Sequence, residues 1–174
     1  KNDGCEVSID NMVEHLNDIA GIRIICSFMS DIYPIADMIA RQADITVLHV
    51  KDYIKYPKTN GYKSYHMVVT IPVYLSEGKR DTKVEIQIRT IAMDFWASLE
   101  HKIAYKFEGK APDYLERELK SCADMVDMLD MKMFSLNQAI MAVEEEERRV
   151  EEEKRREREK AEKRQEELAG NGPT

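Results

Sequence analysis

The stretch HMVVTIPVYLSEGKRDTKVEIQIRT (66–90) decides the fold, because it contains two β-strand patterns separated by a short turn. Residues 66–72 and 83–90 are rich in β-branched residues, and the turn-forming residues 76–78 lie between them. Strands and helices alternate along the rest of the first 110 residues, but these two strands adjoin directly. The stretch therefore predicts a mixed β-sheet rather than a purely parallel one.

The remaining patterns place helices and further strands on both sides of this hairpin. Upstream of it, segments 11–17 and 31–43 are predicted to be helical, and segments 21–28 and 45–50 to be strands. Downstream, residues 92–107 have an amphipathic helix pattern that carries Trp96, the only tryptophan. Residues 1–110 are therefore predicted to form one α+β domain, a mixed sheet flanked by helices.

Residues 111–143 have the pattern of a long packing helix. Apolar residues alternate steps of four and three, which is the heptad seam of a helix packed along a partner. The partner is this domain, another subunit, or each along part of the length. The seam consists of Leu115, Leu119, Cys122, Val126, Leu129, Met133, Leu136, Ile140 and Val143.

The last region, residues 144–174, is dominated by charge. Residues 144–168 contain 12 Glu and nine Lys or Arg, and Glu precedes a basic residue at many i,i+4 spacings. This pattern predicts a solvated helix, and a disordered charged tail is the alternative. The positions that continue the seam beyond Val143 are mostly charged, so we expect close packing to stop there.

The composition restricts the class of protein. The chain has 174 residues and a net charge of −7, which normally argues against anionic ligands, but the charged tail holds three of these negative charges. The sequence has neither an apolar run long enough to span a membrane nor a signal-peptide pattern. Its three cysteines are too few and too scattered for a disulfide framework or a zinc site, so we expect reduced thiols and a cytoplasmic location.

Side-chain alternation gives the predicted sheet one polar face. In strand 83–90 the apolar side chains face one way, and Glu85, Gln87 and Arg89 face the other. Arg23 of strand 21–28 is predicted to share this polar face. The face is either a binding surface or simply the solvent-facing side of an antiparallel sheet.

The segment KDYIKYPKTNGYKSYH (51–66) favours the binding surface. Four lysines alternate with four tyrosines, and residues 57–61 are predicted to form a loop. Cations interleaved with aromatic rings suit a ligand that is both a polyanion and a flat ring, such as a nucleotide. A generic exposed loop is the alternative.

Four segments follow one another in a characteristic order: NDIAGIRIICSF, KDYIKYPKTNGYKSYHMVV, VEIQIRT and AMDFWASLEHKIAYK. They resemble the synthetase domain of the RelA/SpoT family, and more closely its stand-alone small alarmone synthetases, which are GTP pyrophosphokinases. The resemblance covers about residues 10–110. It implies a nucleotidyltransferase-like fold and transfer of pyrophosphate from ATP to the 3′-hydroxyl of GDP or GTP, which makes guanosine tetra- or pentaphosphate.

The resemblance also implies which residues carry the chemistry. Asp18 matches a Mg²⁺ ligand, and Glu85 matches the carboxylate that activates the 3′-hydroxyl and assists the metal. Arg23 matches an arginine placed against the adenine of ATP. Gln87, Arg89, Glu100 and His101 belong to the motifs and are given supporting roles only.

A second group of residues is implied to hold the acceptor nucleotide. Tyr62 matches a tyrosine that stacks on guanine, with Asn60 beside it, and the backbone of Ala97 matches a guanine contact. Residues that hold the acceptor and its phosphates are matched by Lys51, Lys58 and His66.

One part of the family pattern is missing. An Arg-x-Lys-Ser segment that holds the ATP phosphates normally precedes the Asp motif, and nothing in residues 1–17 matches it. We therefore expect an N-terminally shortened chain, and a catalytically impaired or regulatory relative is the alternative to an active synthetase. The resemblance further implies a homo-oligomer, by analogy a tetramer, formed through the helix after Tyr114. Some relatives of this kind also associate with single-stranded RNA.

Overall fold

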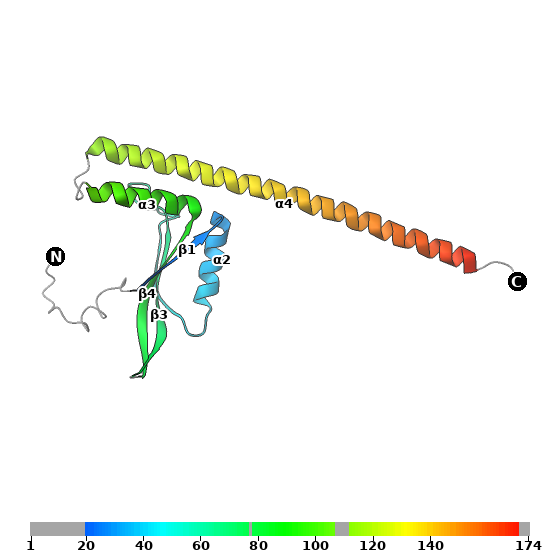
Figure 1. Ribbon diagram of the computed structural model, residues 1–174, viewed down its shortest axis with the longest axis horizontal. Helices are drawn as coiled ribbons and strands as arrows, with labels where there is room; N and C mark the ends of the chain where they lie inside the picture. The colour runs from blue at the N-terminus through cyan, green and yellow to red at the C-terminus, as the bar shows by residue number, and fades with distance from the viewer. Residues whose placement is uncertain (1–19, 77, 107–111, 171–174) are drawn as a thin grey trace. The chain divides into compact units, whose positions relative to one another are not determined.

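The computed structural model describes residues 20–76, 78–106 and 112–170, so the predicted helix over 11–17 and Asp18 lie outside the described residues. The elements, drawn in Figure 1, confirm the predicted α+β order and shift its boundaries by a few residues. They are β1 (Ala20–Cys26), α2 (Met29–Ala40), β2 (Thr46–Asp52), β3 (Tyr65–Leu75), β4 (Gly78–Thr90), α3 (Ile91–Lys106) and α4 (Asp113–Gly170).

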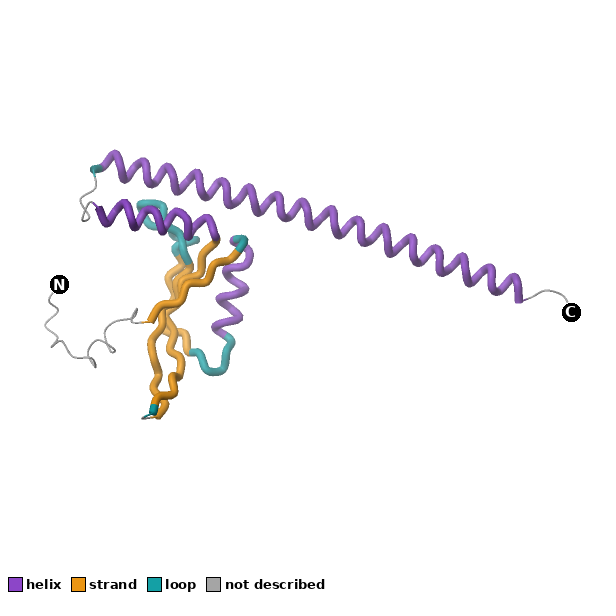
Figure 2. The backbone as a smooth tube through the Cα atoms, in the orientation of Figure 1, coloured by secondary structure: helices purple, strands orange, loops and turns teal. Residues whose placement is uncertain are grey.

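The four strands, drawn in orange in Figure 2, form one mixed sheet in the order β1-β4-β3-β2. β1 pairs with β4 in parallel, whereas β2 with β3 and β3 with β4 are antiparallel. The direct β3–β4 connection therefore gives the mixed sheet that the hairpin pattern predicted.

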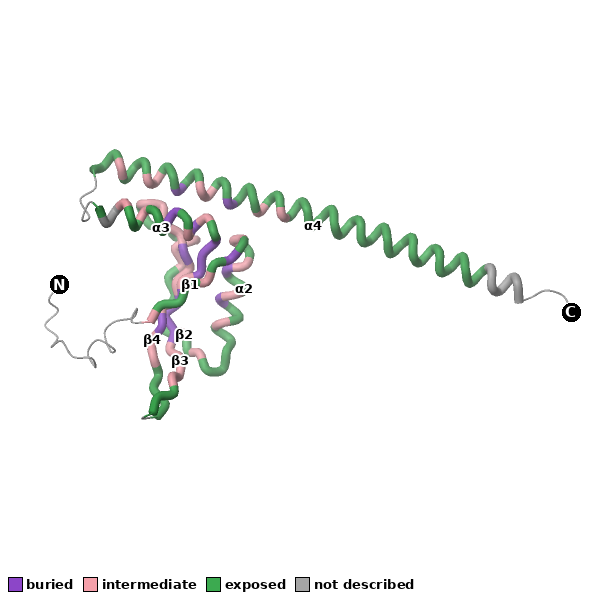
Figure 3. The backbone as a smooth tube through the Cα atoms, in the orientation of Figure 1, coloured by how far each residue is buried: buried purple, intermediate pink, exposed green. Residues whose placement is uncertain are grey.

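The β3–β4 hairpin is longer than its apolar pattern indicated. Pairing continues to Leu75 opposite Gly78, and Gly78 has a φ of +121°, which suits the tight turn. Figure 3 shows the reason for the difference: the strands are buried along their middle and exposed at the tip. Backbone pairing extends beyond the buried part because it does not require burial of the side chains.

The apolar face of the sheet carries the main core. Val84, Ile86 and Ile88 of β4 are buried, as the alternation predicted, in a cluster that includes Ile32 and Ala36 of α2. With α2 covering this face, the polar side chains of β4 lie on the opposite face. The sheet therefore presents its polar residues away from the α2 layer.

α4 is one continuous helical element over the regions predicted separately as a packing helix and a charged tail. The chain nevertheless divides into two compact units, one up to Met131 and one from Lys132 onward. The predicted domain boundaries at residues 110 and 143 stay predictions. None of the helices in the described part of the chain has the length and apolar character that a membrane crossing needs.

In the first unit, α4 packs on α3 through part of the predicted seam. Trp96 Nε1 donates to the backbone oxygen of Leu119 at 3.0 Å, and Ala123 is buried against Trp96. Val126 also packs there, whereas Leu129 is exposed. The row of α4 that packs on α3 therefore follows residues 119, 123 and 126, of which Ala123 is buried, and part of the heptad seam stays uncovered.

In the second unit, the helix is solvated. The remaining seam residues are exposed, and so is every described side chain from 144 to 164. Ion pairs such as Arg149–Glu146 and Arg156–Glu152 span one turn. The structure agrees with the charge-laced helix rather than with a disordered tail.

Candidate active site

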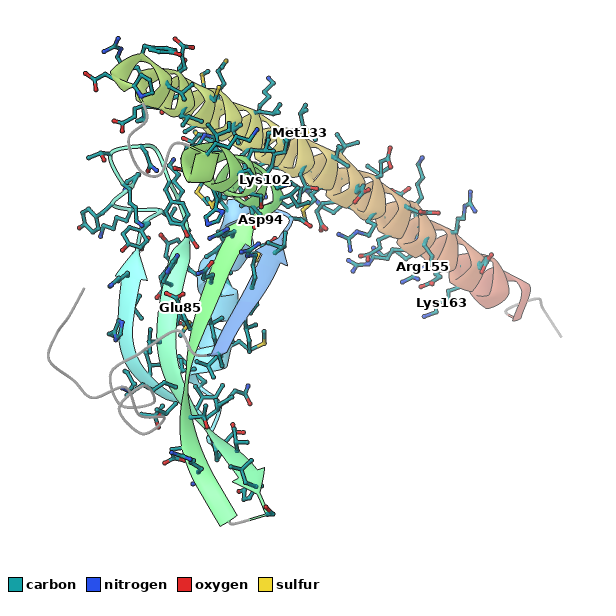
Figure 4. All side chains as sticks on the ribbon, turned by 60° about the vertical axis from the view of Figure 1, so that its left-hand side comes forward. Glu85, Asp94, Lys102, Met133, Arg155 and Lys163 are labelled. Carbon is teal, nitrogen blue, oxygen red and sulfur yellow. The ribbon has the colours of Figure 1, made fainter. Side chains whose placement is uncertain are left out.

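The polar face of the sheet is formed by Arg23, Lys51, His66, Glu85 and Gln87. Lys51 of β2, His66 of β3, Gln87 of β4 and Arg23 of β1 are successive cross-strand partners, so their side chains leave the sheet on the same side. Glu85, labelled in Figure 4, lies two residues before Gln87 and therefore shares this side. Strand register therefore assembles residues that are far apart in the sequence.

Glu85 receives a hydrogen bond at each carboxylate oxygen. His66 Nδ1 lies 2.9 Å from Oε1, and Gln87 Nε2 donates to Oε2 over 2.9 Å. Burial would raise the pKa of this carboxyl, but the hydrogen bonds from Gln87 and His66, with the charge of Lys51, outweigh it and lower the pKa. Glu85 is therefore an ionised carboxylate at neutral pH.

His66 connects Glu85 to Tyr62, because its Nε2 lies 2.8 Å from Tyr62 Oη. Burial lowers the pKa of His66, with Arg89 and Lys58 acting in the same direction, and the hydrogen bond and charge of Glu85 offset this only in part. We therefore treat the close His66–Glu85 contact as a hydrogen bond of a neutral imidazole and not as an ion pair.

Arg89 is the most heavily bonded residue described at the site. Its side chain is 6 % exposed and uses all three nitrogens. Nε donates to Ser64 Oγ at 3.3 Å, and Nη1 donates to Asp94 Oδ1 at 3.1 Å. Nη2 donates both to Tyr62 Oη at 2.6 Å and to Gln87 Oε1 at 2.7 Å. These partners compensate the cost of burying a guanidinium.

Asp94 joins this network to Arg23. Asp94 lies in the first turn of α3 and is labelled in Figure 4. It accepts from Arg23 Nη1 at 3.2 Å as well as from Arg89, so one carboxylate contacts two arginines. The side chain of Arg23 is half exposed and that of Arg89 is buried. Asp94 thus links a solvent-facing cation on β1 to the buried centre of the site.

The loop between β2 and β3 brings Tyr62 to the site. The Gly61 N–H donates to the carbonyl of Lys58 at 2.9 Å, and the Lys58 N–H donates to the carbonyl of Tyr62 at 3.1 Å. Asn60 Oδ1 accepts from the Tyr62 N–H at 3.1 Å, while Asn60 Nδ2 donates to Glu100 Oε1 at 3.2 Å. Asn60 therefore connects this turn to α3.

Cations surround the ring of Tyr62. Lys58 Nζ lies 4.8 Å from its centroid and 5.0 Å from that of Tyr53, and Arg89 Cζ lies 5.2 Å from the Tyr62 centroid. Such positions lie within the range of cation–π attraction. The arrangement supports the nucleotide interpretation of the lysine–tyrosine segment over a generic loop.

Ala97 occupies a different position from the polar residues. It is buried in the cluster that α3 forms with Trp96 and Ala123, and Tyr62 packs against that cluster. The side chain of Ala97 is thus part of the α3–α4 packing, next to the loop that carries Tyr62.

The structure brings most of the predicted site residues together and adds others. Asp94 and Ser64 were not predicted, and Arg89 was given only a supporting role, because their importance depends on partners distant in the sequence. Within the described ranges no three His, Cys, Asp or Glu side chains form a metal-binding group. The predicted residues found within this region are Arg23, Lys51, Lys58, Asn60, Tyr62, His66, Glu85 and Ala97.

Comparison with known proteins finds relatives that match most of the chain. Residues 2–110 match the model of the region found in RelA/SpoT proteins. Over 137 residues the chain is 50 % identical to the GTP pyrophosphokinase YwaC of Bacillus subtilis, covering 79 % of this chain and 65 % of that protein. The chain thus spans just under two thirds of the length of this curated relative.

Two solved structures of Bacillus subtilis proteins are similar in fold. Small alarmone synthetase 2 superposes with a TM-score of 0.72 and 48 % identity, over 79 % of this chain and 71 % of that one. Small alarmone synthetase 1, bound to its product pppGpp, superposes with a TM-score of 0.71 and 39 % identity, over 74 % of this chain and 66 % of that one. The four-stranded mixed sheet with its flanking helices is therefore the synthetase-domain fold.

Proposed function

The chain belongs to the RelA/SpoT family, and we propose that it transfers a pyrophosphate group from ATP to the 3′-hydroxyl of GDP or GTP. The products are AMP and guanosine tetra- or pentaphosphate. The observation that carries this proposal is Glu85, an ionised carboxylate with both oxygens held in place on a face that also presents Lys51 and Arg23.

Glu85 is proposed to be the general base. A ribose hydroxyl is a poor nucleophile, so its proton must pass to a carboxylate within hydrogen-bond reach as it reacts. In the proposed reaction the 3′-oxygen bonds to the β-phosphorus of ATP while its proton passes to Glu85. The bond between that phosphorus and the oxygen of AMP breaks, and AMP leaves.

The acceptor is proposed to lie on the loop that carries Tyr62. Stacking of guanine on the Tyr62 ring aligns the ribose, and Lys58 and Lys51 supply positive charge for the phosphates. Asn60 holds the turn in which Tyr62 lies, through hydrogen bonds on both sides of its amide. His66 and the backbone of Ala97 complete the proposed acceptor site.

ATP is proposed to bind on the side of β1, with Arg23 against the adenine. The cofactor is proposed to be Mg²⁺ held by Asp18 and Glu85, because hard cations prefer carboxylate oxygens. Glu85 fits this role, since each of its oxygens keeps lone pairs beyond its one hydrogen bond. Asp18 precedes Ala20 by two residues, and Ala20 pairs with Val84, the neighbour of Glu85. When bound, the metal would screen the charge of the transferred group.

The experiment that tests this function is direct. The chain is incubated with ATP, Mg²⁺ and either GDP or GTP, and the nucleotides are resolved by ion-exchange chromatography. We expect a guanosine tetra- or pentaphosphate and AMP in equal amounts, and loss of both when EDTA exceeds Mg²⁺. Glu85→Gln should abolish product while the variant still unfolds in a cooperative thermal transition, and Glu118→Gln on exposed α4 surface is the matched control. A parental rate in Glu85→Gln would refute the role of Glu85, and the absence of product from the parent would favour the regulatory alternative.

We also propose that the chain forms a homo-oligomer through α4. The seam residues Met133, Leu136, Ile140 and Val143 are exposed within the second unit, and an apolar row at heptad spacing is typical of helix pairing. Light scattering after gel filtration should give a multiple of the chain mass, and Leu136→Glu with Ile140→Glu should reduce it, whereas Lys132→Glu should not. Binding of single-stranded RNA stays a prediction, which a salt-dependent titration tests.

A further inference from the structure

The hydrogen bonds around Glu85 form a closed ring with two branches, and both branches run from Arg89 to Glu85. Arg89 Nη2 contacts both Tyr62 and Gln87, and those two residues lead by separate routes to the two oxygens of Glu85. One route passes through the hydroxyl of Tyr62 and the imidazole of His66. The other passes through the amide of Gln87.

The guanidinium of Arg89 sets the donor and the acceptor of every hydrogen bond in this ring. A guanidinium has only donors, so Tyr62 and Gln87 must both accept from Arg89. On the shorter route, the oxygen of Gln87 therefore faces Arg89 and its NH₂ faces Glu85. The reversed amide would place NH₂ against the guanidinium and oxygen against the carboxylate, two repulsive contacts at 2.7 and 2.9 Å.

The same reasoning determines the proton positions on the longer route. Because Tyr62 Oη accepts from Arg89, its own hydrogen is directed to His66 Nε2, 2.8 Å away. Because Nε2 accepts from Tyr62, the ring hydrogen of His66 lies on Nδ1, which donates to Glu85 Oε1 at 2.9 Å. Each oxygen of Glu85 thus receives one donor, and the plane of the carboxylate is held from both sides.

We propose that Arg89 is a positioning residue that aims the Glu85 carboxylate through these two routes, and that the hydroxyl of Tyr62 is the link that sets the tautomer of His66. The role of the aimed carboxylate as a base rests on the proposed function. Arg89 itself has a buried side chain and acts through Tyr62, His66 and Gln87. Tyr62 accordingly has two separable functions: its ring stacks on the guanine of the acceptor, and its hydroxyl aligns Glu85.

A purely structural role for Arg89 makes a different prediction. The Arg89–Asp94 ion pair alone would tie β4 to α3, and the Tyr62 hydroxyl would then be dispensable for catalysis. Tyr62→Phe separates these two accounts, because it keeps the ring and removes only the hydroxyl. Tyr33→Phe is the matched control, since the Tyr33 hydroxyl donates to Asp52 Oδ2 at 3.1 Å, away from the polar face.

The first measurement does not require turnover. Multiple-bond ¹H–¹⁵N NMR of the ¹⁵N-histidine-labelled full chain at pH 8 reports which ring nitrogen of His66 carries hydrogen, with His66→Asn used for assignment. We expect the Nδ1–H tautomer in the parent and in Tyr33→Phe, and a mixture of tautomers in Tyr62→Phe. A parent His66 with hydrogen on Nε2, or on both nitrogens, would overturn the proposed direction of the hydrogen bonds from Tyr62 through His66 to Glu85.

The second measurement separates alignment from binding. Tyr62→Phe should lower kcat by about 10-fold, a part of the 100-fold or more that an aligned general base supplies, while the KM of the acceptor stays within about twofold. Arg89→Lys, which keeps a donor, should retain more of the parental kcat than Arg89→Met. An unchanged kcat in Tyr62→Phe would refute the alignment role. If the parent makes no product, the proposed reaction fails, and the tautomer measurement still decides the direction of the ring.

Discussion

Gly61 offers a sharp test of how the loop of Tyr62 is held, through the substitution Gly61→Ala. The backbone φ of Gly61 is +88°, and a Cβ added there would lie 2.5 Å from the Cβ of Ala123 and 3.1 Å from Cδ of Lys120. Lys120 can move, because its side chain is flexible. Ala123 cannot move easily, because its Cβ is fixed to the helix α4 and buried against Trp96.

Two costs add in this variant. A left-handed backbone conformation costs an ordinary residue about 1–2 kcal/mol. The overlap of about 1 Å, relative to an ordinary carbon contact of about 3.5–4.0 Å, is an overpacking that costs about 1–3 kcal/mol. We therefore expect Gly61→Ala to lower the free energy of unfolding by about 2–5 kcal/mol, a large share of the roughly 5–15 kcal/mol that domains possess.

Urea unfolding followed by Trp96 fluorescence measures this loss. The single tryptophan lies in α3 against α4, so its signal reports the first unit rather than the charged helix. All variants are compared at one protein concentration, since association would shift the apparent stability. Gly21→Ala is the matched control, because a Cβ at Gly21 meets nothing within 4 Å, and we expect little change there.

A double-mutant cycle isolates the clash from the backbone cost. In the Ala123→Gly background the opposing Cβ is gone, so Gly61→Ala should cost about 1–3 kcal/mol less than in the parent. The backbone cost should remain in both backgrounds. Two results would refute the reasoning. One is a loss of unfolding free energy below about 0.5 kcal/mol in the parent, which is within the range of neutral surface changes. The other is an equal loss in both backgrounds.

Two further predictions follow from the site and from the contact between β4 and α4. Tyr62→Ala removes both the ring and the hydroxyl. Steady-state kinetics should therefore show the acceptor KM raised by roughly 5- to 150-fold, from about 1–3 kcal/mol of lost stacking, together with a lower kcat. An unchanged KM would contradict stacking. Asp130 Oδ2 accepts from Thr90 Oγ1 at 2.7 Å, and burial, with the charge of Asp127, raises the pKa of Asp130. Folding therefore favours protonated Asp130. The protonated side chain contributes to the free energy of unfolding at acidic pH, and this contribution is lost as the pH rises through the raised pKa. Asp130→Asn should accordingly be at least as stable as the parent at pH 7 and lose this advantage toward pH 4, which thermal melts across that range measure; a less stable variant at pH 7 would contradict the argument.

Local patterns in the sequence were sufficient for the framework of the fold. The alternation in 83–90 predicted which side chains of β4 enter the main apolar core, because neighbouring residues of a strand point to opposite faces wherever the strand lies. The adjoining strands predicted a hairpin and hence a mixed sheet, and pairing in the structure follows. The order of motifs also predicted the family, although the polar face by itself was compatible with a plain solvent-facing surface.

The sequence did not determine what packs against the apolar seam of α4. Its heptad spacing indicated a helix packed along a partner, which could be this domain, another subunit, or each along part of the length. In the structure Leu119 and Val126 lie against α3, whereas the seam residues from Met133 onward are exposed. Periodicity records that a face is apolar, and only the packed structure decides what covers it.

The arrangement of the site depended on tertiary structure for a related reason. The sequence by itself determined the residue types that carry the chemistry, an acid at Glu85 and a lysine–tyrosine loop, because these are properties of single residues and short segments. The ring from Arg89 to Glu85 arises only when the register of β3 on β4 sets His66 opposite Gln87 and the turn at Gly61 returns Tyr62 to them. Hydrogen-bond direction and burial depend on atoms brought together across the sheet, which no local pattern specifies.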